Sequence, residues 1–442
     1  MKQKRILGLP AATSLVIGNM VGSGIFLLPA AMAAIGSIGL FGWIITAWGS
    51  ILLAIIFGKL SQRLPLVGGL YAYCRHELGD FAGYQVSISY LLGNIIGDAA
   101  TVVALLAYLT VFWPDLTTNH TLAFFVGTAI IWLVALINII GVKEVKIVQM
   151  ATTIIKLIPI LLVSLVGLFH IKAENLAFFN VSGQSNLAAL ANAAMLTFFA
   201  FGGLESATVP AENVKNPEVT IYRATVLGTA ITALIYVLST VAIMGMFSPA
   251  SLANNPAPFA AAGRLIFGDL TNWIFAMAAI IACLCTIIGF LFITSQAAMA
   301  TARDGLLPSF LTRLSRFNTP HWAICLSALI MTLLLGMNYS SMLTAQFTLL
   351  VTLSNLCILV PYLYTTVAAM IAFRQFKTTT HRHRAISLIV ISVLACIYVL
   401  FALLGSGQEV IFYGIALLFC LTPFYALMAI HRNNRINKKQ HD

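Results

Sequence analysis

Long apolar runs separated by short polar segments recur along almost the whole chain. Twelve of these runs are long enough to cross about 30 Å of hydrocarbon as a helix. They lie at about residues 9–35, 38–63, 80–112, 122–140, 147–168, 186–210, 221–247, 272–301, 322–337, 346–372, 386–403 and 410–430. The pattern predicts an all-α polytopic membrane protein with twelve transmembrane helices, numbered here as spans 1 to 12, in a single integral membrane domain over residues 1–442.

Span 1 contains a glycine-rich stretch, Gly18-Asn19-Met20-Val21-Gly22-Ser23-Gly24-Ile25-Phe26. Glycine carries the largest backbone entropy cost in a helix, so we expect the helix to break there. Backbone groups freed at membrane depth need a partner inside a protein cavity. The first N–H groups of the second half suit a carboxylate, and the last carbonyls of the first half suit an ammonium. This pair of charges describes a free amino acid, whereas the alternative is that the glycines only allow close helix packing.

A second interruption lies five spans later, in Phe198-Phe199-Ala200-Phe201-Gly202-Gly203-Leu204-Glu205-Ser206. Two interrupted helices at matching places in successive five-span halves are typical of an inverted-repeat transporter with its site at the membrane midplane. Spans 1–5 (about 9–168) would form the first repeat and spans 6–10 (about 186–372) the inverted second repeat, with spans 11–12 (about 386–430) following. The alternative is that the two glycine clusters are unrelated.

The composition agrees with a membrane protein, because only 8% of the residues are charged, against roughly 25% in soluble domains. Placing the N-terminus inside puts 21 of the 24 Lys and Arg residues on the cytoplasmic side and leaves only Lys172 and Arg264 in the outer loops. The positive-inside rule therefore predicts that both termini are cytoplasmic. The net charge of +11 then reflects topology and not nucleic-acid binding.

Three ionisable residues lie well inside the predicted spans: Asp98 in span 3, Lys156 in span 5 and Glu205 in span 6. Each costs at least about 2.5–3.5 kcal/mol to insert at that depth, so we expect them to face a cavity or one another. They are three candidate functional positions.

Short motifs in a characteristic order carry a resemblance to a known family. They are Gly18-Asn19, Gly22-Ser23-Gly24-Ile25-Phe26-Leu27-Leu28-Pro29-Ala30, Gly68-Gly69-Leu70-Tyr71-Ala72-Tyr73, Gly203-Leu204-Glu205-Ser206-Ala207, Lys215-Asn216-Pro217, Tyr236-Val237-Leu238-Ser239-Thr240, Asp304-Gly305-Leu306 and Val360-Pro361-Tyr362-Leu363-Tyr364. In this order the chain resembles, nearly end to end, the amino acid-polyamine-organocation superfamily. Within it the likeness is to the bacterial arginine/agmatine antiporter and to other antiporters of basic amino acids and polyamines.

The resemblance implies a set of substrate-binding residues. The end that would hold the amino and carboxylate groups comprises Asn19, Gly22, Ser23, Gly24, Gly202 and Gly203. Phe199 and Phe290 fall where the arginine/agmatine antiporter has tryptophans, and phenylalanine attracts a cation more weakly, so cation binding should be looser or the ligand different. Tyr90 matches a gating tyrosine, and Ser354 matches a serine near the side-chain end of the pocket.

Asp98 replaces an asparagine of that antiporter, and a carboxylate there would favour a cationic side chain by direct pairing. Glu205, Tyr71 and Tyr362 match gating or coupling positions, although Glu205 could instead make a structural hydrogen bond to a neighbouring helix. Lys156 resembles the lysine that, in other members of the superfamily, takes the place of a sodium ion between spans 1, 5 and 8. The alternative for Lys156 is a salt bridge to Asp98 or Glu205.

These residues favour a secondary transporter that exchanges an amino acid, of the cationic arginine or ornithine type, for its decarboxylated amine or another amino acid. Lys156 and the missing tryptophans support the alternative, proton-coupled uptake of neutral amino acids. A sensor without transport is a third hypothesis, disfavoured because no soluble domain is appended. An enzyme is least expected, since no nucleophile–base pair or metal cluster occurs in the spans.

The expected partners are small-molecule amino acid or amine substrates and the lipid bilayer, with no nucleic acid, cofactor or metal ion. The resemblance also implies a homodimer as the form in which such proteins often occur. The expected location is the plasma membrane, which is the inner membrane of a bacterium, with several crossings.

Overall fold

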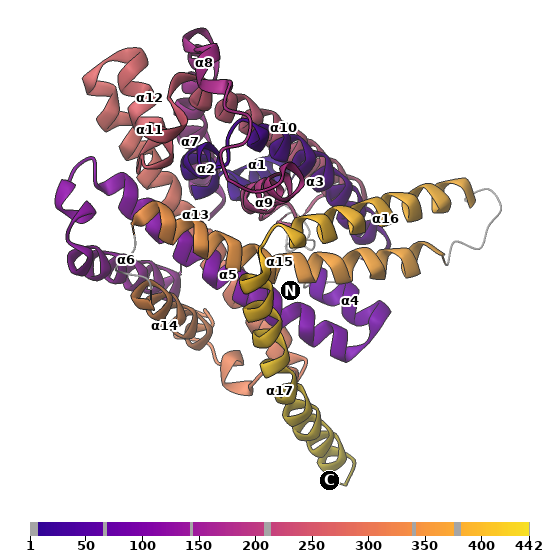
Figure 1. The fold of residues 1–442 in the computed structure, drawn as a ribbon. Helices are drawn as coiled ribbons and strands as arrows, with labels where there is room; N and C mark the ends of the chain where they lie inside the picture. The colour runs from indigo at the N-terminus through magenta and orange to yellow at the C-terminus, as the bar shows by residue number, and fades with distance from the viewer. Residues whose placement is uncertain are drawn as a thin grey trace.

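The computed structural model describes residues 8–64, 69–141, 145–206, 214–337, 342–374 and 382–441, and over these residues the protein is a bundle of helices (Figure 1). Gly68 and Ala207 of the motifs lie outside the described residues, as do Lys2, Lys4, Arg5, Lys143 and Lys377 among the 21 basic residues of the charge argument. The all-α class predicted from the apolar runs is confirmed.

Every predicted span contains a helix, and the helix ends lie close to the predicted ones except at the C-terminal ends of spans 6 and 12. The spans correspond in order to α1 (Leu9–Met20) with α2 (Ser23–Ala33), α3 (Ile38–Arg63), α5 (Asp80–Leu109), α6 (His120–Ile140), α7 (Val145–Gly167), α9 (Asn186–Phe198), α10 (Pro217–Met246), α13 (Asp269–Arg303), α14 (His321–Met337), α15 (Leu343–Arg374), α16 (Arg382–Leu404) and α17 (Gln408–His441). Eight helices of the described part are each long and apolar enough to cross a membrane, and α1 with α2 makes a ninth, bent span. The shorter apolar stretches Lys156–His170, Asn186–Phe201 and His321–Met337 coincide with predicted spans 5, 6 and 9.

Several short helices, most of them in the connections between spans, were not predicted, because they are too short or too polar to read as spans. They are α4 (Leu70–Leu78), η1 (Pro114–Thr117), η2 (Leu168–His170), α8 (Ala173–Leu176), η3 (Phe199–Phe201), α11 (Pro249–Ala253), α12 (Pro258–Phe267) and η5 (Ser309–Thr312). Glycines bound α4 on both sides: Gly69 has φ +58° and Gly79 has φ +91°, a conformation that other residues rarely adopt.

α5 forms the centre of the bundle and packs against α15, α13, α4 and α2 (Figure 1). Of its most apolar 18-residue stretch, 83% is buried, compared with 6% for α17, which projects from the bundle in Figure 1. Small residues allow α5 this position, since a side chain at Gly93 would meet Ile358 of α15 at 2.6 Å. α3 packs against α10 and α9 on the other side of the cavity described below.

Both predicted helix breaks are present. Span 1 bends by 42° between α1 and α2, at Val21 and Gly22. In span 6 the α-helix ends at Phe198, and one turn of 3₁₀-helix leads into a turn that reaches Ser206, with Gly203 at φ +93°. Predicted span 6 is therefore interrupted at its glycines, as expected, because positive φ at Gly203 cannot continue a right-handed helix. Residues 207–210 of that span lie outside the described residues.

Candidate functional site

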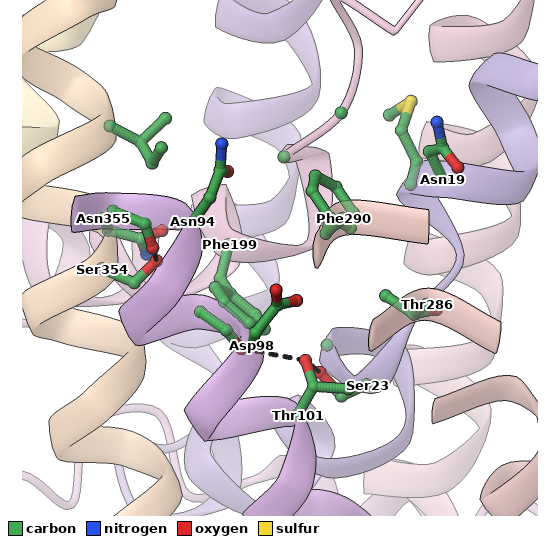
Figure 2. Close-up of a pocket in the computed structure, with 18 of the residues that line it drawn as sticks. Asn19, Ser23, Asn94, Asp98, Thr101, Phe199, Thr286, Phe290, Ser354 and Asn355 are labelled. Atoms are coloured by element: carbon green, nitrogen blue, oxygen red, sulfur yellow. Dashed lines mark hydrogen bonds between the residues drawn. The ribbon is translucent and has the colours of Figure 1, made fainter. Parts of the chain in front are cut away.

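A cavity lies where the two helix breaks meet α5, α13 and α15 (Figure 2). Its lining includes eleven residues expected from the sequence: Asn19, Gly22, Ser23, Gly24, Asp98, Phe199, Gly202, Gly203, Glu205, Phe290 and Ser354. Tyr71, Tyr90, Lys156 and Tyr362 do not line it and contact other parts of the protein. The tertiary fold thus brings residues from distant spans to one place.

The backbone end of the cavity is the start of α2. The first N–H groups of a helix have no partner within it, so those of Ser23 and Gly24 are available to an anion. A methyl group added to Gly24 would lie 3.1 Å from Cα and Cβ of Ala200, and one added to Gly22 would lie 2.8 Å from Cγ2 of Thr286. The glycines therefore also allow close helix packing, which was the alternative explanation for them. A side chain at Gly24 or Gly22 would first push on Ala200 or Thr286, respectively.

The last carbonyls of α1 already have protein partners. The Lys156 ammonium donates to the Gly18 carbonyl oxygen, and the Tyr236 hydroxyl donates to the Met20 carbonyl oxygen at 2.6 Å. The same hydroxyl lies 2.9 Å from the carbonyl oxygen of Ala200 in η3. One side chain of α10 thus links the break in span 1 to the break in span 6.

Asp98 lies on the cavity wall with 3% of its surface exposed. Figure 2 shows its carboxylate pointing into the open space between Phe290, Thr286 and the Ser23–Thr101 pair. The carboxylate of Asp98 makes no hydrogen bond or ion pair within the part of the chain that the structure describes. A buried carboxylate without a partner is costly, so this position favours a cationic ligand.

Glu205 lines the same cavity, but tyrosine hydroxyls from two helices hold its carboxylate. Oε1 accepts a hydrogen bond from Tyr90 of α5 at 2.9 Å, and Oε2 accepts one from Tyr362 of α15 at 2.6 Å. The Tyr362 ring packs edge-on against Phe57 and Phe198, with centroids 5.0 and 5.4 Å away. Glu205 thus joins the turn after η3 to α5 and α15.

Lys156 lies outside the cavity, 2% exposed, on the span 5 helix α7, which packs against both α1 and α13. It forms no ion pair with Asp98 or Glu205 in the described ranges. The bond to the Gly18 carbonyl joins span 5 to the break in span 1, and the role of Lys156 as a cation between spans 1, 5 and 8 stays a prediction from the resemblance.

Tyr71 belongs to a polar cluster at the end of the bundle where α4 lies. Its hydroxyl donates to Asp304 at 2.8 Å, and Arg75 contacts both Asp304 at 2.6 Å and Asp80 at 2.8 Å. Burial and the neighbouring Asp304 carboxylate raise the pKa of Tyr71, so its phenol stays protonated near neutral pH. The cluster connects α4 to the start of α5, at Asp80, and to the end of α13, at Asp304.

The two aromatic residues that replace tryptophans flank the cavity. The Phe199 ring meets Phe347 edge-on at 5.9 Å, and a side chain at Gly97 would approach Phe199 to 3.4 Å. The Phe290 ring tip lies 3.0 Å from where a Cβ on Gly203 would sit, so that glycine is also needed for close approach.

Sequence reasoning missed nine lining residues. They are Met20, Gly93, Asn94, Gly97, Thr101, Phe198, Thr286, Asn355 and Ile358. Four of them share a stripe on α5, where Gly93, Gly97 and Thr101 recur every four residues beside Asn94 and Asp98. This small and polar stripe around a charged residue was the signal that could have found them.

A helical membrane protein with a cavity at two helix breaks has the architecture of a secondary transporter. The chain belongs to the amino acid permease family, whose model matches residues 7–429. It is 30% identical over 414 residues to a cadaverine/lysine antiporter of Escherichia coli strain K12, with 92% of this chain and 91% of that protein covered.

Two further relatives are putrescine transporters. The one from Haemophilus influenzae is 25% identical over 96% of this chain and 97% of its own length, and the one from Escherichia coli strain K12 is 25% identical over 96% of each. The superfamily membership expected from the motifs is confirmed. The protein is a multi-pass membrane transporter and not an enzyme.

Proposed function

We propose that the protein exchanges a cationic amino acid for the amine formed by its decarboxylation, by alternating access across the inner membrane of a bacterium. The activities of the relatives, cadaverine/lysine antiport and putrescine transport, support a basic amino acid paired with a diamine. They favour lysine or ornithine over arginine, which stays a prediction from the motifs.

The observation that carries the proposal is the bare carboxylate of Asp98 in the cavity wall. A positive group about 4 Å from it gains on the order of 1–4 kcal/mol, between water-like and protein-surface dielectrics. The ammonium of a lysine side chain or of a diamine would satisfy this charge, whereas a neutral side chain would leave it buried and unpaired.

The other end of the ligand would meet the start of α2. The N–H groups of Ser23 and Gly24 and the positive end of the helix dipole suit the carboxylate of an amino acid. Phe199 and Phe290 would cover the aliphatic part between the two ends, and Asn19, Gly202 and Gly203 would close the side next to the breaks. Ser354 would lie near the distal group.

We propose that the contacts that break and reform during the exchange cycle are those made by polar residues around the cavity and at the α4 end of the bundle. Glu205 with Tyr90 and Tyr362 would act as a gate, since breaking two bonds frees the turn after η3 from α5 and α15. Tyr71 and Asp304 would close the path at the α4 end of the bundle. The proposed motion is that of two inverted five-span repeats with both termini cytoplasmic.

The test is Asp98→Asn, which keeps the shape of the side chain and removes its charge. Purified protein is titrated with lysine, cadaverine and a neutral amino acid such as leucine. We expect the affinity for lysine and cadaverine to fall about tenfold or more, and that for leucine to change less than about twofold.

Glu205→Gln is the matched control, because it removes the other carboxylate of the same cavity. Its oxygens are already bonded to tyrosines, so it should affect charged and neutral ligands alike. Equal losses for lysine and leucine in Asp98→Asn would reject the cationic substrate.

One observation favours a second candidate, proton-coupled uptake of neutral amino acids. The Lys156 ammonium occupies a cation position beside span 1, which fits transport without sodium, and phenylalanines stand in the place of both tryptophans. Liposome flux separates the two: exchange requires substrate on the far side, whereas uptake requires only a proton gradient.

A further inference from the structure

The cavity wall contains four hydroxyl side chains, Ser23, Thr101, Thr286 and Ser354. Thr286 donates its proton to the Ala282 carbonyl oxygen at 2.9 Å. Ser354 donates to the carbonyl oxygen of Gly93 at 2.7 Å. Both hydroxyls can therefore offer only their lone pairs to a ligand.

The remaining two hydroxyls form a short chain across the cavity floor (Figure 2). Thr101 Oγ1 donates to the carbonyl oxygen of Gly97 at 2.9 Å and lies 2.9 Å from Ser23 Oγ. Because Thr101 has one proton, the bond between the two hydroxyls takes its proton from Ser23. Ser23 then also faces the cavity as an acceptor.

Thr101 lies one turn of α5 from Asp98. Thr101 follows Asp98 by three residues on α5, so the two side chains lie on one face of that helix, about one turn apart. Thr101 holds Ser23 Oγ on the same side of the cavity, where the Asp98 carboxylate points inward in Figure 2. In the proposed pose the side-chain ammonium pairs with Asp98 and the other end of the ligand reaches Ser23 at the start of α2, so a second ammonium there would meet the lone pairs of a hydroxyl.

Building on the proposed exchange, we infer that Thr101 is a specificity-determining residue that tunes the site toward the amine relative to the amino acid. By taking the proton of Ser23, it keeps that hydroxyl an acceptor at the point where the two exchange partners differ. A diamine has only N–H donors, so it gains from every acceptor in the wall. An amino acid also has a carboxylate, which an acceptor at Ser23 repels and which the N–H groups of α2 must hold alone.

Without the Thr101 hydroxyl, Ser23 regains a free proton and can donate it to a carboxylate. Thr101→Val removes the hydroxyl at nearly constant shape, and Thr101→Ser retains it. The ratio of the dissociation constants for cadaverine and lysine is the informative quantity, because a general loss of structure would weaken both ligands together and leave the ratio unchanged.

The experiment measures cadaverine and lysine binding to purified full-length wild type, Thr101→Val and Thr101→Ser, with size-exclusion profiles as the check on folding. We expect Thr101→Val to raise the cadaverine-to-lysine ratio about fivefold to tenfold, and Thr101→Ser to keep the wild-type ratio. Thr101→Ala also removes the hydroxyl and serves if Thr101→Val is not monodisperse.

Two results overturn different claims. An unchanged ratio in a hydroxyl-free variant that still binds both ligands, or an equal shift in Thr101→Ser, would refute the role of Thr101 and leave the exchange intact. Wild-type protein that binds neither cadaverine nor lysine would refute the proposed exchange, and the inference about Thr101 would fall with it.

Discussion

Two buried carboxylates line the same cavity, and their surroundings differ. Asp98 has no bonded partner among the described residues, whereas both oxygens of Glu205 accept tyrosine hydroxyls at 2.9 and 2.6 Å. Both are 3% exposed, so burial does not distinguish them. The difference lies in hydrogen bonding, which satisfies one charge within the protein and leaves the other to a ligand.

This comparison distinguishes a carboxylate whose charge is free for a ligand from one that links helices to each other. The carboxylate of Glu205, held by tyrosines from α5 and α15, links the turn after η3 to both helices, and in the proposed transport cycle these bonds would break and reform. A bare carboxylate on the buried helix α5 does not join elements, so its charge is available to select the ligand. Three substitutions test this division, in order of decreasing expected effect.

Lys156→Met tests whether the third buried charge, the Lys156 ammonium, takes part in selecting the ligand. Losing the ammonium leaves the Gly18 carbonyl without its donor, and a buried bond to a charged group is worth about 1.5–3 kcal/mol. Exchange in liposomes should fall on the order of tenfold to a hundredfold, while the preference for lysine over leucine stays as in wild type. Lys59→Met, at a partly buried lysine of α3 bonded to Gln62, is the control.

Two outcomes would contradict this assignment of Lys156. Wild-type flux that rises with a sodium gradient would mean that the ammonium does not replace a sodium ion. A changed lysine-to-leucine preference in Lys156→Met would mean that Lys156 influences Asp98. Ligand selection would then depend on Lys156 as well as on the two carboxylates.

Glu205→Gln directly tests the link that the Glu205 carboxylate makes between the turn after η3 and helices α5 and α15. Glutamine keeps one carbonyl oxygen, so only one of Tyr90 and Tyr362 retains a good acceptor, and the bonds lose their charge assistance. The exchange rate should fall about tenfold through a loss of about 1–2 kcal/mol in the closed state, with ligand affinities within about threefold of wild type. A cation-specific loss of affinity with a normal exchange rate would show that Glu205 binds the ligand instead.

Gly24→Ala supplies a perturbation that does not depend on charge. The new methyl would lie 3.1 Å from Ala200 and 3.3 Å from Phe199, which pushes the two helix breaks apart by a few tenths of an ångström. Lysine and leucine binding should weaken together by about fivefold, in line with roughly 1 kcal/mol of overpacking. Unchanged affinity in monodisperse protein would remove the backbone groups of α2 from the site.

Much of the fold was predictable because hydrocarbon imposes one solution on every long apolar run. The helix ends of span 2, at Ile38 and Arg63, match the prediction to the residue. The breaks at Gly22 and Gly203 were predictable for the opposite reason, since glycine and polar residues at membrane depth cannot continue a shielded helix at low cost. The loop helix α4 was missed because its polar nine residues carry no membrane signal.

The sequence alone determined which residues are chemically unusual: Asp98, Lys156 and Glu205 stand out in apolar spans, and local composition suffices to identify them. Their contacts were decided only by the tertiary structure, because the groups that they meet are far away in the chain. Glu205 meets Tyr362 across 157 positions, Lys156 reaches Gly18 across 138, and Asp98 has no bond among the described residues. Hydrogen bonding acts over about 3 Å and depends on which helices pack side by side, so a local pattern can locate a charge but cannot tell what satisfies it.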